Sequence, residues 1–333
     1  MTGPQKTLVR NIKNRIMEKL TFSQQVKNEI LLNQHQPPCC LNAFLTAVIM
    51  SSELSISQKG VGFCISSINL DFVKYIAQIV DKLYGQQTDI LAENVNKNKY
   101  LYTITVFNQQ ILFDCGVLYR DDNGLTQINS NVSPYVIEQE CCKKSFVRAL
   151  FLCCGSVVVP QITDEKQSLS YKMEFALSNS NLALTLVQIM SQFGFDFKSI
   201  DRKSGVSVYI QESDTLSDIL TFFGAQQCMF VLEDVKIARM LRNQANRQAN
   251  CDVANINKSI DAAEKQIECI KKLIESGKMN LLDDKLKQMA DLRMENASAS
   301  IAELADMLGI TKSGAAHRMN KLIEFAEQEQ LDT

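Results

Sequence analysis

Cysteine is the residue type whose chemistry stands out in this sequence. Six of the eleven cysteines form the doublets Cys39-Cys40, Cys141-Cys142 and Cys153-Cys154. Thiolates bind soft metal ions such as Zn²⁺. However, no Cys-x-x-Cys pair occurs, and adjacent cysteines do not easily ligate one tetrahedral ion. His35 and His317 are the only two imidazoles that could add ligands. An odd cysteine number without a visible secretory signal predicts reduced thiols in a cytoplasm. We therefore expect buried structural cysteines, with no metal and no other cofactor.

Two of the doublets belong to an internal repeat with a constant offset of 102 residues. Residues 39–52 match residues 141–154, including the doublet, one Phe and one Ala. The material after each copy is also alike. The first copy is followed by strand-like 62–68, helix-like 70–84 closed by Gly85, and alternating 100–106; the second is followed by 171–177, 182–193 closed by Gly194, and 205–211. The shared order favours a duplication over two unrelated helices that look alike.

The repeated helices carry small residues four positions apart, which share one helix face and allow two helices to approach closely. These residues are Ala47 and Ser51 in one copy and Ala149 and Cys153 in the other. The spacing resembles the LAGLIDADG motif of homing endonucleases. The resemblance implies a pseudo-twofold αββαββα fold with two such helices at its centre, in which the last Asp of each motif binds catalytic metal.

The two metal-binding positions of that motif are not acidic in this chain. With the motif placed on 45–53 and 147–155, the acid positions fall on Ser52 and Cys154. A metal-dependent nuclease needs hard oxygen ligands to hold Mg²⁺ and activate water, and Glu53, one place beyond, lacks a symmetric mate. We therefore expect a retained fold without catalysis, so that the protein is not an enzyme; a residual endonuclease is the disfavoured alternative.

A basic segment follows the second repeat. Residues 236–251 contain four basic residues and no acid, and amide side chains surround them. Arg and Lys contact phosphates, whereas Asn and Gln also reach base edges. The alternative is a solvated helix face. The predicted DNA contacts are Arg242, Asn243, Arg247, Asn250, Asn255 and Lys258. A long connecting helix is predicted over 252–275, ended by Ser276-Gly277.

The C-terminal region predicts a helix-turn-helix. After a helix over 279–294, residues 299–308 form a helix with Ser298 or Ser300 as N-cap, Gly309 makes the turn, and Thr311 caps a helix from 312 to about 327. The start of the second helix enters the major groove in this motif. Its expected contacts are Lys312, Ser313, His317, Arg318 and Lys321, and residues 310–323 contain no acid.

From Phe22 to about Glu327 the chain resembles the WhiA family of bacterial transcription regulators. The landmarks are Phe22-Ser-Gln-Gln-Val-Lys-Asn-Glu29, the repeated doublets, Phe223-Gly224-Ala225, Arg242-Asn-Gln-Ala-Asn-Arg-Gln-Ala-Asn-Cys-Asp-Val-Ala-Asn255 and Lys312-Ser-Gly-Ala-Ala-His-Arg318. The resemblance implies a degenerate LAGLIDADG domain joined to a helix-turn-helix. It also implies roles in cell division and chromosome segregation, or in sporulation among spore-forming relatives.

These observations predict an α+β fold: a pseudo-twofold duplicated αββαββ LAGLIDADG-like domain followed by an all-α helix-turn-helix domain. The predicted parts are an N-terminal extension (1–21), the LAGLIDADG-like domain (22–232), the basic segment with its connecting helix (233–277) and the helix-turn-helix domain (278–333, motif 299–327). The expected partners are double-stranded DNA and another transcription regulator or RNA polymerase. A protein-binding cell-division factor, with DNA binding secondary, is the alternative.

Composition excludes several other classes of protein. With 46% hydrophobic and 22% charged residues, the chain is neither disordered, collagen-like nor histone-like. No apolar run is long enough to span a membrane. A net charge of −2 argues on average against nucleic acid, but the positive charge is concentrated in the acid-free windows 236–251 and 310–323. We expect a cytoplasmic, nucleoid-associated protein, with a monomer favoured.

Overall fold

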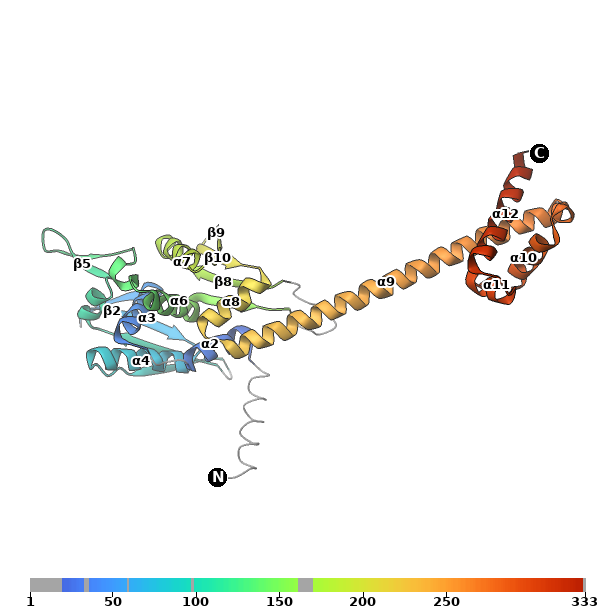
Figure 1. Ribbon diagram of the computed structural model, residues 1–333. Helices are drawn as coiled ribbons and strands as arrows, with labels where there is room; N and C mark the ends of the chain where they lie inside the picture. Colours follow the sequence, from blue (N-terminus) through green and yellow to red (C-terminus); the bar gives the residue numbers. More distant parts are fainter. Residues whose placement is uncertain (1–19, 33–35, 59, 97–98, 161–169, 332–333) are drawn as a thin grey trace, which may run out of the picture. The chain divides into compact units, whose positions relative to one another are not determined.

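The computed structural model describes residues 20–32, 36–58, 60–96, 99–160 and 170–331 (Figure 1). The chain divides into two compact units, Met1–Arg239 and Met240–Thr333, and each is described by itself. The expected N-terminal extension, apart from Leu20 and Thr21, and His35 lie outside the described residues.

The first unit contains the predicted duplication. Each repeat is a helix, two strands, a second helix and two more strands. The first repeat consists of α3 (Pro38–Met50), β1 (Glu53–Ser57), β2 (Gly60–Ser67), α4 (Leu70–Tyr84), β3 (Ile90–Asn96) and β4 (Lys99–Val106). The second consists of α6 (Glu140–Cys154), β7 (Gly155–Val158), β8 (Lys172–Leu177), α7 (Ser180–Gln192), β9 (Lys198–Arg202) and β10 (Gly205–Ile210). The αββαββ prediction is therefore confirmed.

The two sheets share one topology. Their strand orders are β1-β2-β4-β3 and β7-β8-β10-β9, and every pairing is antiparallel. The central strands follow the predicted stretches. The edge strands β1, β3, β7 and β9 were not located from the sequence. Almost all side chains of β3 and β9 are exposed, so neither of these two shows an apolar alternation.

Further elements of the first unit surround the repeats. They are α2 (Phe22–Leu32), α5 (Gln109–Asp114), the hairpin of β5 (Leu118–Arg120) and β6 (Thr126–Ile128), the 3₁₀ turn η1 (Pro134–Ile137), and α8 (Ser213–Phe223). The hairpin lies between the repeats in the sequence. Helix α9 (Gln226–Glu275) begins in this unit and continues into the second.

Equivalent caps define the outer helix of each repeat. The Asn69 side chain accepts hydrogen bonds from two backbone amides at the start of α4, and the Asn179 side chain does the same for α7. Gly85 and Gly194 close these helices with φ of 64° and 82°, a conformation that favours glycine. Both predicted glycine stops are confirmed.

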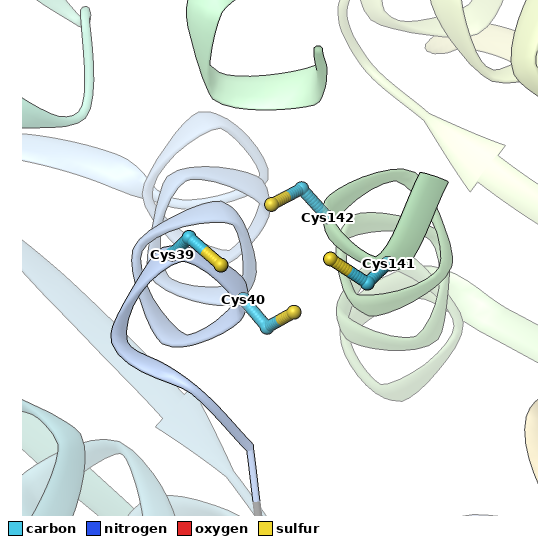
Figure 2. Close-up of side chains that lie close together, drawn as sticks. All are labelled: Cys39, Cys40, Cys141 and Cys142. Atoms are coloured by element: carbon cyan, nitrogen blue, oxygen red, sulfur yellow. The ribbon is translucent and has the colours of Figure 1, made fainter. Parts of the chain in front are cut away.

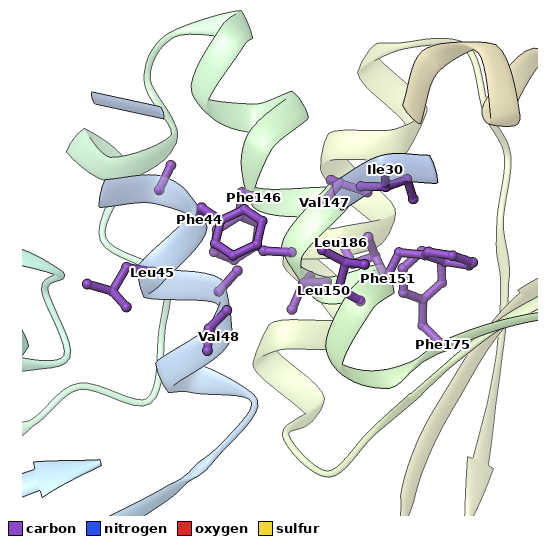
Figure 3. Packing of buried hydrophobic residues seen from close by; sticks show 14 of the residues in the cluster. Ile30, Phe44, Leu45, Val48, Phe146, Val147, Leu150, Phe151, Phe175 and Leu186 are labelled. Atoms are coloured by element: carbon purple, nitrogen blue, oxygen red, sulfur yellow. The ribbon is translucent and has the colours of Figure 1, made fainter. Parts of the chain in front are cut away.

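The packing of α3 against α6 forms the centre of the first unit. The contact between α3 and α6 is more extensive than the contact between any other two elements. Ala47 and Ala149 are completely buried, so that the two helices approach closely. Phe44 and Phe146 are also buried and belong to one continuous hydrophobic core, part of which is shown in Figure 3. The small residues recognised in the sequence therefore serve close helix packing.

Helix α2 braces three other helices through consecutive polar side chains. Lys27 Nζ donates to the Leu152 carbonyl oxygen near the end of α6 (3.1 Å), and the Asn69 amide donates to Asn28 Oδ1 (2.9 Å). Both carboxylate oxygens of Glu29 accept backbone amides at the start of α9, at 2.7 and 2.9 Å. A carboxylate there satisfies unpaired N–H groups and favours the helix dipole.

The second unit is helical. It contains the later part of α9, the 3₁₀ turn η2 (Lys278–Leu281), α10 (Asp284–Glu295), α11 (Ile301–Met307) and α12 (Lys312–Leu331). Three helix predictions need correction. The helix expected from 252 begins at Gln226, since no Gly or Pro interrupts the basic segment. The helix expected from 279 begins at Asp284, where Asp283 provides the N-cap. Helix α12, expected to end at about 327, extends to Leu331. The predicted domain boundary after residue 232 lies inside α9, and the predicted domain boundary after residue 277 lies just beyond the end of α9.

The regular isoleucines of α9 do not form a buried face throughout. Ile270 is buried, but Ile256 and Ile260 are 59% and 49% exposed. Every side chain from residue 240 to residue 262 is exposed, because no described element of the second unit covers this part of the helix. The isoleucines of α9 therefore follow helical spacing without forming a buried face along the whole helix.

Arg293 is the largest fully buried side chain of the second unit. Its guanidinium donates to the carbonyl oxygens of Asn296 and Ala299, in the loop between α10 and α11. Burial lowers the pKa of Arg293, but a guanidinium stays charged in proteins. A charged donor that satisfies two carbonyls in a small core fixes the path of the chain into α11.

Replacing Ala149 with Leu should destabilise the first unit by about 1–3 kcal/mol, because the extra carbons overpack the α3–α6 contact. All eight tyrosines lie between Tyr75 and Tyr209 and the chain has no tryptophan, so urea unfolding followed by intrinsic fluorescence reports on this unit alone. Ala92→Leu, at an exposed site on β3 of the same unit, is the matched control. Equal midpoints for the two variants would contradict close packing at Ala149.

Replacing Arg293 with Met should destabilise the second unit by about 1–3 kcal/mol, because two carbonyl groups lose a charged donor while the volume is largely kept. Far-UV circular dichroism should show earlier helix loss in urea, while the tyrosine transition of the first unit stays where it is in wild type. The same change at exposed Arg247 controls for loss of charge. A shifted tyrosine transition would mean that Arg293 acts outside its own unit.

Candidate nucleic-acid interface

Helices α11 and α12 form the predicted helix-turn-helix around a small core. Ala305, Ala315, Met319 and Leu322 are buried between them and α10. Gly309 makes the turn with φ of 65°, which favours glycine. The small side chains of Ala305 and Ala315 let the two helices pack closely on either side of this turn.

Local hydrogen bonds fix where both helices begin. The sequence left Ser298 and Ser300 open as N-cap of α11, and Ser300 takes this position: its hydroxyl accepts the Glu303 amide (3.2 Å), while the Glu303 carboxylate accepts the Ser300 amide (2.7 Å). Thr311 Oγ1 accepts the Gly314 amide (3.2 Å), which caps α12 as predicted. The turn is thus held at both ends.

The predicted DNA contacts of α12 lie on its solvent side. Lys312, Ser313, His317 and Lys321 are exposed and Arg318 is half-buried. Ser313 and His317 lie four residues apart opposite the buried face, and Lys312, Arg318 and Lys321 lie around them. The helix therefore presents hydroxyl and imidazole groups at the centre of its face and cations around them.

One exposed residue on this face was missed by the sequence reasoning. Asn320 lies one turn beyond His317 and is exposed. An amide can pair with the N6 and N7 atoms of adenine, so it belongs among the candidate base contacts. Asn320 is uncharged, so a search for basic residues does not find it. Its position three residues after His317, on the same helix face, is the signal that would have identified it as a candidate contact. Glu324, also exposed, is the first acid after the start of α12 and ends the acid-free face.

The basic segment on α9 is smaller than its composition suggested. Lys236 lies 2.5 Å from Asp214 and 2.9 Å from Glu233, so two carboxylates neutralise it. The guanidinium of Arg239 lies over the Tyr171 ring, 5.5 Å from its centroid. These two of the four basic residues serve the first unit. Glu233 lies just outside the acid-free window, whereas Asp214 and Tyr171 are distant in the sequence.

The remaining residues of the segment are exposed on α9. One side of the helix carries a row of four side chains at helical spacing: Asn243, Arg247, Asn250 and Lys258. Arg242 lies on one flank of this row and Asn255 on the other. Asn255 donates to Cys251 Sγ (3.7 Å). The six predicted side chains therefore form an extended band that covers more than half of the circumference of one helix.

The two degenerate acid positions turn inward onto their own helices. Ser52 Oγ donates to the Ile49 carbonyl oxygen (2.8 Å), and Cys154 Sγ donates to that of Leu150 (3.0 Å). Burial raises the pKa of the Cys154 thiol to about 12, so it carries no charge at neutral pH. Neither group can neutralise a divalent ion.

A cation, Lys27, lies near a position at which a nuclease of this fold carries a metal-binding carboxylate. Lys27 binds the Leu152 carbonyl oxygen, and its charge interacts with Cys153 and Cys154; burial lowers its pKa and these thiols oppose that shift. A neighbouring cavity of about 340 Å³ is lined by Ser52 and Cys153, and among its described lining residues Glu53 is the one carboxylate. A lone carboxylate is a poor site for Mg²⁺.

The expectation that the cysteines are buried is wrong for several of them. Cys39, Cys141 and Cys251 are exposed, whereas Cys40 and Cys142 are buried. The first two doublets lie together: their four sulfur atoms are all within 4.8 Å of one another (Figure 2). One doublet by itself is a poor ligand set, which is why the sequence predicted no metal. Across α3 and α6 the doublets jointly supply four soft ligand atoms.

The helices of the described residues include none that is both long and apolar enough to cross a membrane.

Comparison with known proteins assigns both parts of the chain. Residues 143–242 match the family model of the WhiA LAGLIDADG-like domain, and residues 245–326 match that of the WhiA C-terminal HTH domain. The crystal structure of full-length WhiA from Thermotoga maritima superposes with a TM-score of 0.56 at 19% identity, covering 93% of this chain and 99% of that one. At this identity the likeness supports the fold alone.

Relatives extend the match over nearly the whole chain. The probable cell division protein WhiA of Bacillus cereus is 31% identical over 317 residues, covering 93% of this chain and 97% of the relative. Its counterpart from a Geobacillus species is 32% identical over 318 residues, covering 93% and 96%. The chain belongs to the WhiA family, in which a LAGLIDADG-like domain is joined to a C-terminal helix-turn-helix.

Proposed function

We propose that this protein is a non-catalytic regulator of transcription that binds double-stranded DNA and acts in cell division and chromosome segregation. The observation that carries the proposal is the exposed, acid-free start of α12, held on a buried helix-turn-helix core. The names of the relatives, probable cell division proteins, support the cellular role.

Helix α12 supplies the sequence-reading contacts in this proposal. Its N-terminal end favours phosphate through unpaired N–H groups and the helix dipole. Lys312, Arg318 and Lys321, around the exposed face, bind the backbone, while Ser313, His317 and Asn320, at its centre, contact base edges in the major groove. The acid Glu324 sets the far limit of the contact.

The band on α9 adds contacts to the phosphate backbone. Arg242, Arg247 and Lys258 are exposed cations, and Asn243, Asn250 and Asn255 are exposed amides. Phosphate contacts position a protein without reading sequence. We therefore assign α12 to recognition and the band to affinity.

The LAGLIDADG-like domain acts in this proposal as a scaffold and a protein-contact surface. On its second sheet Glu174 binds both Lys172 (2.6 Å) and Arg202 (3.0 Å), so its carboxylate offsets part of their positive charge. Together with Ser52, Cys154 and Lys27, this supports loss of nuclease activity. Its partner is another transcription regulator or RNA polymerase, on a nucleoid in the cytoplasm, with the chain acting as a monomer.

Replacing Arg318 and Lys321 with Ala should weaken duplex binding and reduce the slope of log affinity against log salt by about 1 for each phosphate that is no longer bound. Fluorescence anisotropy with labelled duplex DNA across a salt series measures both. Lys271→Ala with Lys285→Ala removes two exposed charges from other helices and is the matched control. An unchanged slope in the Arg318 and Lys321 variant would exclude α12 as the DNA contact.

Genome-wide mapping of bound DNA, compared between wild type and the Arg318→Ala, Lys321→Ala variant, then tests the role in the cell. Loss of bound sites near division genes is the expected outcome. If residues 1–275 alone restore a deletion strain, DNA reading by α12 is dispensable and the protein is instead a protein-binding division factor.

Purified protein should not nick supercoiled plasmid in Mg²⁺ or Mn²⁺, because the two acid positions are neutral and Lys27 adds a positive charge beside them. Agarose gels over a time course measure this. If nicking appears, Glu53→Gln separates the sources: loss of nicking would identify residual endonuclease activity, whereas persistence would identify a contaminant.

A further inference from the structure

We propose that Cys39, Cys40, Cys141 and Cys142 bind one Zn²⁺ ion between the first turns of α3 and α6, as a structural site that joins the two repeats. The site lies at the opposite ends of these helices from Ser52 and Cys154. It is therefore separate from the degenerate nuclease positions, and it does not rest on the proposed function.

The sulfur positions fit a closed tetrahedral site. All four sulfur atoms lie within 4.8 Å of one another, and Figure 2 shows them converging from the two helices. Zinc–sulfur bonds of about 2.3 Å place the sulfurs of a tetrahedron about 3.8 Å apart. Rotation of the thiol side chains closes this difference without moving either helix.

The ligand type selects a single soft ion. Four thiolates complete the coordination shell of Zn²⁺ without water, as in structural zinc sites. Mg²⁺ and Ca²⁺ prefer oxygen ligands, so they are excluded by chemistry. The close spacing also favours one ion over an iron–sulfur cluster, whose cysteines surround a larger core.

The four cysteines occupy equivalent positions in the two helices. Cys39 and Cys40 lie in the first turn of α3, and Cys141 and Cys142 lie in the first turn of α6. The positive dipole ends of both helices are therefore next to the sulfurs, where the negative charge of a zinc–thiolate centre would lie. The same positions recur in both repeats, so the duplication itself makes the ligand set symmetric.

The surrounding contacts hold the two first turns together. Ser145 is buried on α6, and its hydroxyl donates to the Cys40 carbonyl oxygen on α3 (2.7 Å). Cys40 and Cys142 are buried whereas Cys39 and Cys141 are exposed, so one side of the cluster is shielded and the other allows an ion to enter. This combination is suited to stable binding at a helix interface.

The full-length protein, purified under reducing conditions, tests the proposal. Elemental analysis should find one zinc per chain in wild type and none in the Cys39→Ser, Cys141→Ser variant, which changes only the exposed pair. Cys251→Ser, an exposed cysteine outside the cluster, should keep its zinc. Adding Co²⁺ to metal-free wild type should produce the intense visible bands of tetrahedral thiolate cobalt.

A second measurement is independent of the folding of the variants. Zn²⁺ added to metal-free wild type should protect Cys39, Cys40, Cys141 and Cys142 from alkylation, as mapped by peptide mass spectrometry, and should raise the urea midpoint of tyrosine fluorescence. Equal alkylation with and without Zn²⁺, or disulfides between the two doublets under reducing conditions, would overturn the proposal.

Discussion

The close contact between α3 and α6 is the constraint on which the first unit depends. Two helices approach this closely only if the residues between them are small, and Ala47 and Ala149 are completely buried there. Each helix carries its own four-stranded sheet, so their contact also joins the sheets. It further places corresponding residues of the repeats together, which is why one end of the pair gathers four cysteines and the other carries both degenerate acid positions.

Much of this fold follows from the sequence because each repeat contains local signals. The glycines after α4 and α7 and the central strands are marked by capping and alternation. The edge strands β3 and β9 are exposed, and hydrogen bonding to a neighbour defines them rather than any pattern of their own. The continuity of α9 was hidden in a similar way, because its basic segment has no apolar period.

Side-chain chemistry was harder to predict than backbone structure, since it depends on partners far away in the sequence. One cysteine doublet alone is a poor metal site, but a second doublet lies beside it, contributed by the other repeat, and no local pattern shows this. Glu29 gives the same lesson. It stands within a recognisable stretch, but its role became visible only where its carboxylate meets the first amides of α9.

Net charge misleads for the same reason. Charges act over about 10 Å at moderate salt, so a phosphate responds to the nearest side chains and not to the average of the chain. In the first unit Glu174 offsets part of the charge of Lys172 and Arg202, and two acids neutralise Lys236. The first turns of α12 contain cations and no acid. A chain of net charge −2 can therefore present a locally positive helix, because the fold places its acids elsewhere.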